Sequence, residues 1–249
     1  MIIFVTGATA GFGAAIARKF VNAGHQVIAT GRRIERLQAL KTELGDALHI
    51  VQLDVTERAS IEQAIASLPA NLQKIDVLVN NAGLALGMET ADKASLDDWE
   101  TMIDTNTKGL VYMTRALLPG MVARNVGHVI NIGSTAGNWP YAGGNVYGAT
   151  KAFVRQFSLN LRTDLFGTKV RVTNIEPGLC GGTEFSSVRF KGDEEKVGQT
   201  YDKTDPLTAE DIAESVFWVA TLPAHVNINT MEMMPVNQSL AGLRVHRDA

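Results

Sequence analysis

The chain has 249 residues, 45% of them hydrophobic, and a formal net charge of −3 at pH 7. This is enough apolar material for a substantial core, and no basic run marks a nucleic-acid surface, so we expect neither DNA nor RNA as a partner. No run of roughly 18 apolar residues occurs, and strand-like residues begin at Ile2 without a basic leader, so we expect no membrane span and no signal peptide. Cys180 is the single cysteine, which excludes an internal disulfide and suits a reducing cytoplasm.

Short apolar runs alternate with longer amphipathic stretches as far as about residue 233. We predict strands at Ile2–Thr6, Gln26–Thr30, His49–Leu53, Ile75–Asn80, His128–Ile132, Val170–Ile175 and Ile228–Met233. We predict helices at Phe12–Ala23, Arg33–Leu44, Ala59–Leu68, Asp97–Leu118, Val146–Leu165 and Thr208–Ala220. Strands separated by helices imply right-handed crossovers and a parallel sheet that is covered on both faces. The predicted fold class is therefore α/β, a single-domain, Rossmann-like, doubly wound sheet of about seven strands over residues 1–249.

One segment breaks this rhythm. Residues 178–205 are rich in glycine and charge and show no strand or helix pattern. A long irregular insert in a compact domain is usually functional, so we expect a lid over the substrate and cofactor. Ligands of open α/β sheets bind beyond the carboxyl ends of the strands, and the candidate functional residues do follow predicted strands.

A glycine-rich loop, TGATAGFG, joins the first predicted strand to the first predicted helix. A helix N-terminus offers free N–H groups to phosphate, and glycine lets the backbone approach the pyrophosphate and the helix pack closely on the strand. The alternative is an ordinary glycine-rich turn. We expect the pyrophosphate of a dinucleotide at Gly7, Ala8, Thr9, Ala10, Gly11, Phe12 and Gly13.

Two arginines follow the second predicted strand, where NAD sites usually carry a carboxylate. Arg32 and Arg33 can bind phosphate through their guanidinium groups, which favours NADP(H) over NAD. Alternatively, Arg33 merely begins a solvated helix. Asp54 follows the third strand and could contact adenine or cap a helix.

Tyr147 and Lys151 are four residues apart at the start of a predicted helix and share one face. An ammonium beside a phenol favours the phenolate, so we expect Lys151 to lower the pKa of Tyr147 toward the range of a general acid/base. Ser134 follows the fifth strand, where its hydroxyl can bond a substrate carbonyl oxygen. The alternative is a serine turn with a surface tyrosine.

Asn106 lies within the long predicted helix from Asp97. Asparagine competes there for backbone bonds, which suggests a kink or a bound water, the alternative being an exposed helix position. The five histidines show no metal-ligand spacing, so we expect no catalytic metal. Cys180 has no obvious activating partner in the sequence, so we interpret it as a packing residue and not as a nucleophile.

In its motifs and their order, the sequence resembles the classical short-chain dehydrogenase/reductase family. These motifs are TGATAGFG, the NNAG at residues 80–83, Asn106, Ser134, Tyr147-x-x-x-Lys151 and the Pro177-Gly178 pair. The resemblance implies that Tyr147 donates or accepts the proton, Lys151 binds the nicotinamide ribose, Ser134 orients the carbonyl and Asn106 holds a relay water. It also implies that the cofactor contacts Val55, Asn81, Tyr147, Lys151, Pro177, Gly178, Leu179, Cys180, Gly181, Gly182, Thr183, Glu184 and Phe185.

Longer stretches such as STAGNWPYAGGNVYGATK resemble, within that family, NADP-dependent members that act on small 3-hydroxy acids. This implies L-allo-threonine, L-serine or 3-hydroxypropionate as substrate, or malonic semialdehyde in the reverse direction. It also implies a homotetramer in which Asp97–Leu118 and Val146–Leu165 pack across subunits. The alternatives are a 3-oxoacyl or general carbonyl reductase and a non-catalytic NADP-binding regulatory protein.

A hydroxy acid brings a carboxylate, and burying that charge unpaired would be costly. Arg189, in the lid segment, carries the planar guanidinium that suits a carboxylate best. We therefore expect Arg189 to bind the substrate together with Ser134 and Tyr147. Lys191 is the weaker candidate, and the alternative is that both are solvated lid charges.

Overall fold

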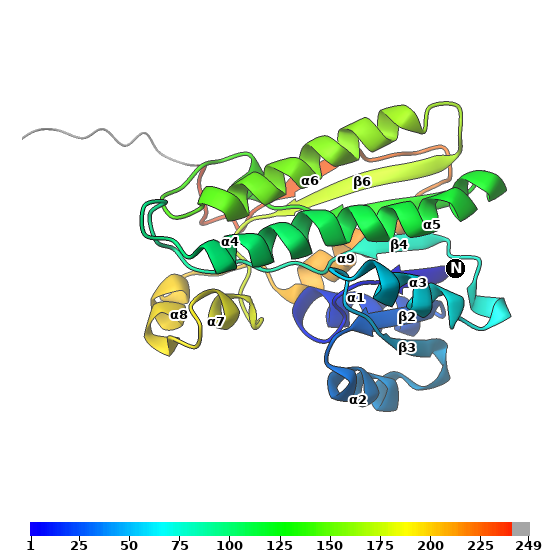
Figure 1. Ribbon diagram of the computed structural model, residues 1–249, viewed down its shortest axis with the longest axis horizontal. Helices are drawn as coiled ribbons and strands as arrows, with labels where there is room; N and C mark the ends of the chain where they lie inside the picture. The colour runs from blue at the N-terminus through cyan, green and yellow to red at the C-terminus, as the bar shows by residue number, and fades with distance from the viewer. Residues whose placement is uncertain (241–249) are drawn as a thin grey trace, which may run out of the picture.

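The computed structural model describes residues 1–240, so His246 and the rest of 241–249 lie outside the described chain. Its framework is one parallel sheet in the order β3-β2-β1-β4-β5-β6-β7 (Figure 1). The strands are β1 (Ile2–Val5), β2 (Gln26–Gly31), β3 (Leu48–Gln52), β4 (Val77–Asn80), β5 (Gly127–Ile132), β6 (Val170–Pro177) and β7 (Thr230–Met233). The strand order reverses between β1 and β4, which is the switch point where such sheets bind ligands. The predicted fold class is confirmed.

Helices cover both faces of the sheet (Figure 1). On one face lie α1 (Gly11–Asn22), α2 (Ile34–Leu44) and α9 (Ala209–Thr221). On the other lie α3 (Arg58–Ala66), α5 (Leu110–Arg124) and α6 (Asn145–Asp164). Three further helices, α4 (Leu96–Ile103), α7 (Phe185–Arg189) and α8 (Glu194–Tyr201), lie toward the carboxyl ends of the strands. Within residues 1–240, none of the helices is both long enough and apolar enough to span a membrane.

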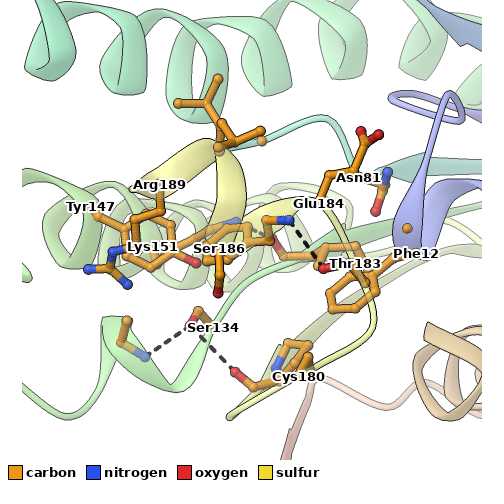
Figure 2. Close-up of a pocket in the computed structure, with 18 of the residues that line it drawn as sticks. Phe12, Asn81, Ser134, Tyr147, Lys151, Cys180, Thr183, Glu184, Ser186 and Arg189 are labelled. Atoms are coloured by element: carbon orange, nitrogen blue, oxygen red, sulfur yellow. Dashed lines mark hydrogen bonds between the residues drawn. The ribbon is translucent and has the colours of Figure 1, made fainter. Parts of the chain in front are cut away.

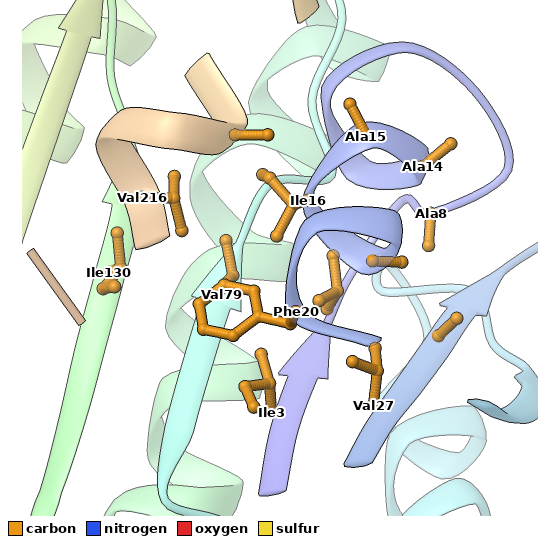
Figure 3. Packing of buried hydrophobic residues seen from close by; sticks show 14 of the residues in the cluster. Ile3, Ala8, Ala14, Ala15, Ile16, Phe20, Val27, Val79, Ile130 and Val216 are labelled. Carbon is orange, nitrogen blue, oxygen red and sulfur yellow. The ribbon is translucent and has the colours of Figure 1, made fainter. Parts of the chain in front are cut away.

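The two cores follow from the twofold alternation of side chains along each strand. In β1, Ile3 and Val5 face α1 and α9, whereas Phe4 faces α3 and α5. Figure 3 shows the first core, in which Phe20 of α1 fills the space between the sheet and α9. Its ring meets Phe217 edge-on at a centroid distance of 5.3 Å. Full burial on both faces explains why the strands are apolar throughout.

The predicted helix over Asp97–Leu118 is a composite of α4, a π turn at Asp104–Gly109, and α5. It also continues beyond the predicted end, because α5 passes through Pro119 and stops only at Asn125, whose φ of 52° is left-handed. The lost backbone bond at Pro119 is outweighed by burial of Met113, Leu117 and Met121 against the sheet.

The expectation of an irregular segment at 178–205 is wrong, because it contains α7 and α8. The Asp193 side chain accepts a hydrogen bond from the Lys196 amide at 3.2 Å and caps α8. Gly192 has a φ of 85° and lets the chain turn between the two helices. The predicted start of α9 is confirmed by a capping box between Thr208 and Asp211.

Candidate active site

A cavity of about 760 Å³ opens at the carboxyl ends of the strands and extends to the lid segment (Figure 2). Most of the predicted cofactor and substrate residues line it. They are Gly7, Thr9, Ala10, Gly11, Phe12, Arg32, Arg33, Asp54, Val55, Asn81, Ser134, Tyr147, Lys151, Pro177, Gly178, Leu179, Cys180, Thr183, Glu184, Phe185 and Arg189. The predicted residues that do not line it are Ala8, Gly13, Asn106, Gly181 and Gly182.

The glycine-rich loop bends over the end of β1 and opens α1 at Gly11. A Cβ atom on Gly13 would lie 2.3 Å from the Gly7 carbonyl oxygen, so helix and loop could not pack this closely around any other residue. The Asn81 side-chain amide donates to the Thr6 and Gly7 carbonyls at 2.9 and 3.1 Å and so holds the loop in place. The free N–H groups at the start of α1 therefore face the cavity, where a pyrophosphate fits.

The two arginines differ in their partners. Arg33 Nη2 donates to Thr9 Oγ1 at 3.1 Å and pairs with Glu184 at 2.9 Å. Arg32 uses its main-chain oxygen, which accepts from Gln52 at 2.9 Å, and within residues 1–240 its guanidinium has no partner. Both arginines line the edge of the cavity that follows β2, where a 2′-phosphate would be bound.

Asp54 is not a helix cap. Its Oδ1 accepts from the Thr56 amide at 3.0 Å and from the Thr56 hydroxyl at 2.8 Å, whereas the residue that precedes α3 is Glu57. Asp54 instead closes a turn at the cavity wall. Of the two interpretations of the sequence, the capping of α3 is wrong.

Tyr147 and Lys151 lie on the cavity side of α6, one turn apart (Figure 2). The Lys151 ammonium is 5.8 Å from the centroid of the Tyr147 ring and donates to the Ile132 carbonyl at 2.8 Å. The Ser134 hydroxyl accepts from the Ala136 amide at 3.1 Å and donates to the Pro177 carbonyl at 3.4 Å. Tyr147 and Lys151 are buried, so a surface tyrosine is excluded.

Burial controls the titration of this pair. It raises the pKa of Tyr147 well above 10, and the Ser134 hydroxyl and the Arg189 guanidinium oppose this only in part. Burial also lowers the pKa of Lys151 to about 8. The expected lowering of the tyrosine pKa by Lys151 is therefore wrong for the protein alone, because desolvation of the phenolate outweighs the neighbouring charges.

Asn106 is buried inside the π turn, which excludes the exposed interpretation. Its Oδ1 accepts from the Leu84 amide at 2.9 Å, and its Nδ2 donates to the Leu84 carbonyl at 2.8 Å and to Thr150 at 3.1 Å. Such a π turn is a common distortion at functional sites. The side chain thus ties the segment after NNAG to α6, and its predicted contact with a relay water stays a prediction.

Arg189 is the basic lid residue that reaches the cavity, where it lies over Tyr147 (Figure 2). Its Nε donates to the Gly87 carbonyl at 3.2 Å and its Nη2 to the Tyr141 hydroxyl at 2.7 Å. Its guanidinium carbon lies 5.4 Å from the Tyr141 ring centroid and 5.6 Å from that of Tyr147. Within residues 1–240, Nη1 has no hydrogen-bonding partner. By contrast, Lys191 pairs with Asp98 at 2.8 Å and does not line the cavity.

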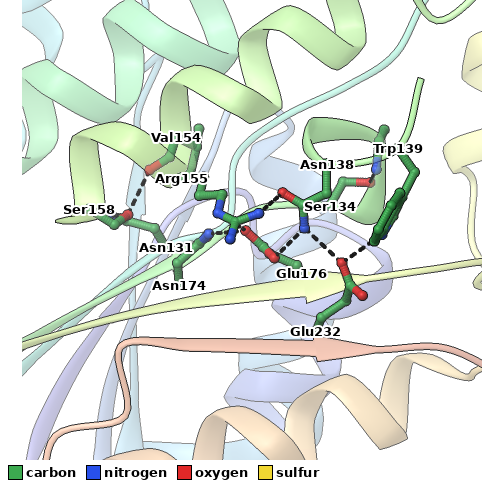
Figure 4. Close-up of polar contacts among 11 residues, drawn as sticks. Asn131, Ser134, Asn138, Trp139, Val154, Arg155, Ser158, Asn174, Glu176 and Glu232 are labelled. Carbon is green, nitrogen blue, oxygen red and sulfur yellow. Dashed lines mark hydrogen bonds and ion pairs between the residues drawn. The ribbon is translucent and has the colours of Figure 1, made fainter.

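A polar network that the sequence did not reveal anchors the loop after Ser134 (Figure 4). Asn138 Nδ2 donates to Glu176 and Glu232, each at 2.7 Å, and Arg155 donates to Asn138 Oδ1. The Trp139 indole also donates to Glu232, at 3.0 Å. Burial raises the pKa of Glu176. These partners are 17 to 94 residues apart, so no local pattern could have indicated them.

Trp139 and Tyr141 both line the cavity. Cys180 also lines it, and burial raises the pKa of its thiol to about 12. The thiol is therefore protonated at neutral pH, as suits a packing residue. In residues 1–240, no group of three or more His, Cys, Asp or Glu side chains is placed to hold a metal ion.

Comparison with known proteins gives one consistent family. The chain is 77% identical over 247 residues to a Salmonella typhi protein named NADP-dependent 3-hydroxy acid dehydrogenase YdfG, covering 99% of this chain and 100% of that protein. It is 54% identical to the serine 3-dehydrogenase of Agrobacterium fabrum (strain C58), covering 99% and 98% of the two chains. A solved structure described as the closed form of serine dehydrogenase complexed with NADP+ is 75% identical, covers 100% of both chains and gives a TM-score of 0.99. Residues 1–194 match the family model described as short chain dehydrogenase. Since that match spans most of the sequence and the relatives align along nearly all of it, this chain belongs to the short-chain dehydrogenase family.

Proposed function

We propose that this protein is an NADP(H)-dependent oxidoreductase that transfers a hydride between the nicotinamide and C3 of small 3-hydroxy acids or their 3-oxo forms. The observation that carries the proposal is a single cavity that joins the phosphate-binding loop to Ser134, Tyr147 and a lid arginine, Arg189. The names of the close relatives, an NADP-dependent 3-hydroxy acid dehydrogenase and a serine 3-dehydrogenase, support it.

The residues that would hold NADP(H) carry the chemistry this group requires. The start of α1 would bind the pyrophosphate, and the guanidinium of Arg32 would bind the 2′-phosphate, while Arg33 lies beside it and pairs with Glu184. The other parts of NADP(H) would be contacted by Asp54, Val55, Asn81 and the segment 177–185. When bound, the nicotinamide supplies or accepts the hydride.

Tyr147 would exchange the proton with the substrate oxygen, and Ser134 would orient that oxygen through its hydroxyl. The raised pKa of Tyr147 keeps the phenol neutral at pH 7, which is the form needed to protonate a substrate during reduction. Lys151, whose pKa is about 8, still carries its charge on most molecules at pH 7. It would assist loss of the phenolic proton in the oxidative direction. Because oxidation needs the phenolate, its rate should increase with pH while Lys151 keeps its charge, which is below about pH 8.

Arg189 would bind the substrate carboxylate. Its Nε and one N–H of Nη2 donate to Gly87 and Tyr141. The remaining edge of the guanidinium, formed by Nη1 and the second N–H of Nη2, has no partner in the described part of the chain. Because Arg189 lies above Tyr147, a carboxylate on this edge would place the C3 carbon of a short acid near the phenol. The lid segment 178–205 would close the acid off from water.

A substrate panel with NADPH absorbance as the readout tests the proposal. Malonic semialdehyde should support NADPH oxidation, and L-allo-threonine, L-serine and 3-hydroxybutyrate should support NADP+ reduction. Acids should be turned over faster than neutral carbonyls of equal size because of Arg189. Turnover of long-chain ketones but not of small acids would contradict the substrate assignment.

We further propose a cytoplasmic homotetramer. Exposed apolar side chains lie on α4 and α6, among them Leu96, Ile103 and Phe153. These helices lie side by side on the outer face of the molecule (Figure 1). Packing against the same face of another subunit would remove this apolar surface from water. Light scattering on the purified protein measures the mass of the assembly.

A further inference from the structure

A lid carboxylate is shared by two arginines across the mouth of the cofactor groove. Glu184 Oε2 accepts from Arg33 Nη2 at 2.9 Å, and Glu184 Oε1 accepts from Arg36 Nη2 at 3.3 Å. Glu184 directly precedes α7, whereas the two arginines lie at the start of α2, 148 and 151 positions away. These ion pairs therefore join the lid segment to the start of α2, two regions that are far apart in the sequence.

The pairs lie where a dinucleotide would pass. Thr9, Arg33 and Glu184 all line the cavity, and Arg33 Nη2 bonds Thr9 Oγ1 as well as Glu184. The preceding lid residue, Thr183, lies over the phosphate-binding loop, since a Cβ atom on Gly11 would be 3.3 Å from its Cβ. Figure 2 shows Thr183 and Glu184 on the same side of the cavity as Phe12. The lid thus reaches the loop that would hold the pyrophosphate.

This contact admits two opposite roles. Glu184 could act as an anion that competes with the 2′-phosphate for Arg33. Alternatively, Arg33 serves the lid, and Arg32, whose guanidinium has no partner within residues 1–240, serves the phosphate. The geometry favours the second role, because both carboxylate oxygens of Glu184 are engaged and Arg33 connects the lid to Thr9 of the loop at the same time.

We propose that Glu184 is a cofactor-retaining residue, whose ion pairs with Arg33 and Arg36 fasten the lid across the dinucleotide groove and must open before the nucleotide leaves. This rests on the proposed function, because it requires a nicotinamide dinucleotide in the groove. Since the fastening joins lid to loop, it acts on any dinucleotide, with or without a 2′-phosphate. The competition role, by contrast, concerns NADP(H) alone.

The test is the release rate of reduced nucleotide from wild type and Glu184→Gln. Bound NADPH or NADH is chased with excess NADP+ or NAD+ in a stopped-flow instrument while nicotinamide fluorescence is recorded. We expect Glu184→Gln to release both nucleotides about 3- to 10-fold faster, which corresponds to about 0.6–1.4 kcal/mol, as two partly exposed ion pairs allow. Raising the salt concentration should speed release from wild type by a larger factor than from the variant, because the variant lacks the two ion pairs.

Two further variants sharpen the result. Glu195→Gln removes another lid carboxylate, one that accepts from Gln199 at 3.2 Å and pairs with no arginine of residues 1–240. It should leave the release rates unchanged. Arg36→Gln should speed release by a smaller factor and add nothing in the Glu184→Gln background. A thermal melt of each variant checks that the fold is retained.

Three outcomes would overturn the proposal. They are an unchanged release rate in Glu184→Gln, slower release of NADPH alone, which is the mark of competition, and an equal effect of Glu195→Gln, which is the mark of general lid charge. Failure of the proposed function looks different, because wild type would then show no fluorescence change with NADPH at all.

Discussion

Replacing Arg189 with methionine tests the substrate assignment most directly. The change removes the guanidinium and keeps an unbranched side chain of comparable width. Among residues 1–240, neither Nη1 nor the second N–H of Nη2 has a partner, so two coplanar N–H groups could bind the proposed carboxylate. Loss of a charge-assisted pair of this kind costs about 2–3 kcal/mol, which lowers kcat/KM for an acid about 30- to 150-fold.

The same substitution has a second effect that must be separated from the first. The Arg189 charge lowers the pKa of Tyr147 and stacks on its ring at 5.6 Å, so its loss slows proton transfer to every substrate. The informative quantity is therefore a ratio. Malonic semialdehyde and propanal have almost the same size and differ in the carboxylate. Their relative kcat/KM with NADPH isolates the carboxylate contact.

We expect Arg189→Met to lower the ratio of malonic semialdehyde to propanal about 30-fold or more. Tyr141→Phe is the matched control, because it keeps the charge and removes the oxygen that accepts from Nη2 at 2.7 Å. It should lower the ratio only a few-fold. Equal losses on both substrates in Arg189→Met would refute the clamp and leave Arg189 as a support for the lid.

Three further predictions concern the cofactor and the proton. Tyr147→Phe should lower kcat by about two to four decades while NADPH binding, followed by fluorescence, stays within about twofold; retention of a tenth of the activity contradicts the acid/base role. Arg32→Asp should lower the NADPH/NADH ratio of kcat/KM by about ten- to a hundredfold, and an aspartate at Gly31 is unsuitable because its Cβ would lie 2.5 Å from Thr9 Cγ2. Lys151→Met should stabilise the cofactor-free protein against urea at pH 7 by up to about 3 kcal/mol, since the folded pKa of about 8 lies below the unfolded value of about 10.4. Wild-type stability rises with pH across that window, so the difference between the proteins should shrink toward pH 10, and a constant difference would contradict the buried charge.

The sequence was sufficient for features that depend on local geometry. The twofold alternation of β1 and the helical spacing of Tyr147 and Lys151 each follow from neighbours within a few residues. The glycine-rich loop also belongs to these local features, since its position between β1 and α1 is enough to predict pyrophosphate binding. Asn106 predicts a distortion because asparagine is unfavourable inside a helix, and the structure shows this distortion as a π turn.

Features set by tertiary contact could not be predicted. The partners of Asn138 and of Glu184 come from distant segments, and their residue types are ordinary. The pKa of Tyr147 differs from its prediction for a related reason. Sequence spacing identifies the neighbouring charge of Lys151, but the degree of burial, which here has the larger effect, depends on the whole cavity.

The proposed site has one part that depends on local geometry and another that depends on tertiary contacts. The groups proposed for proton transfer, Ser134, Tyr147 and Lys151, stand at strand and helix ends that the core holds in place. The proposed carboxylate contact instead depends on Arg189 of α7, which is held by Gly87 and by the Tyr141 hydroxyl. Those three residues come from separate surface segments, so the position of the guanidinium depends on contacts between the lid segment and two loops. The proposed recognition of the acid would therefore depend on how the lid segment is placed, whereas the proton-transfer groups do not depend on it. Substitutions that loosen the lid should accordingly weaken selectivity for acids before they abolish turnover of neutral carbonyls.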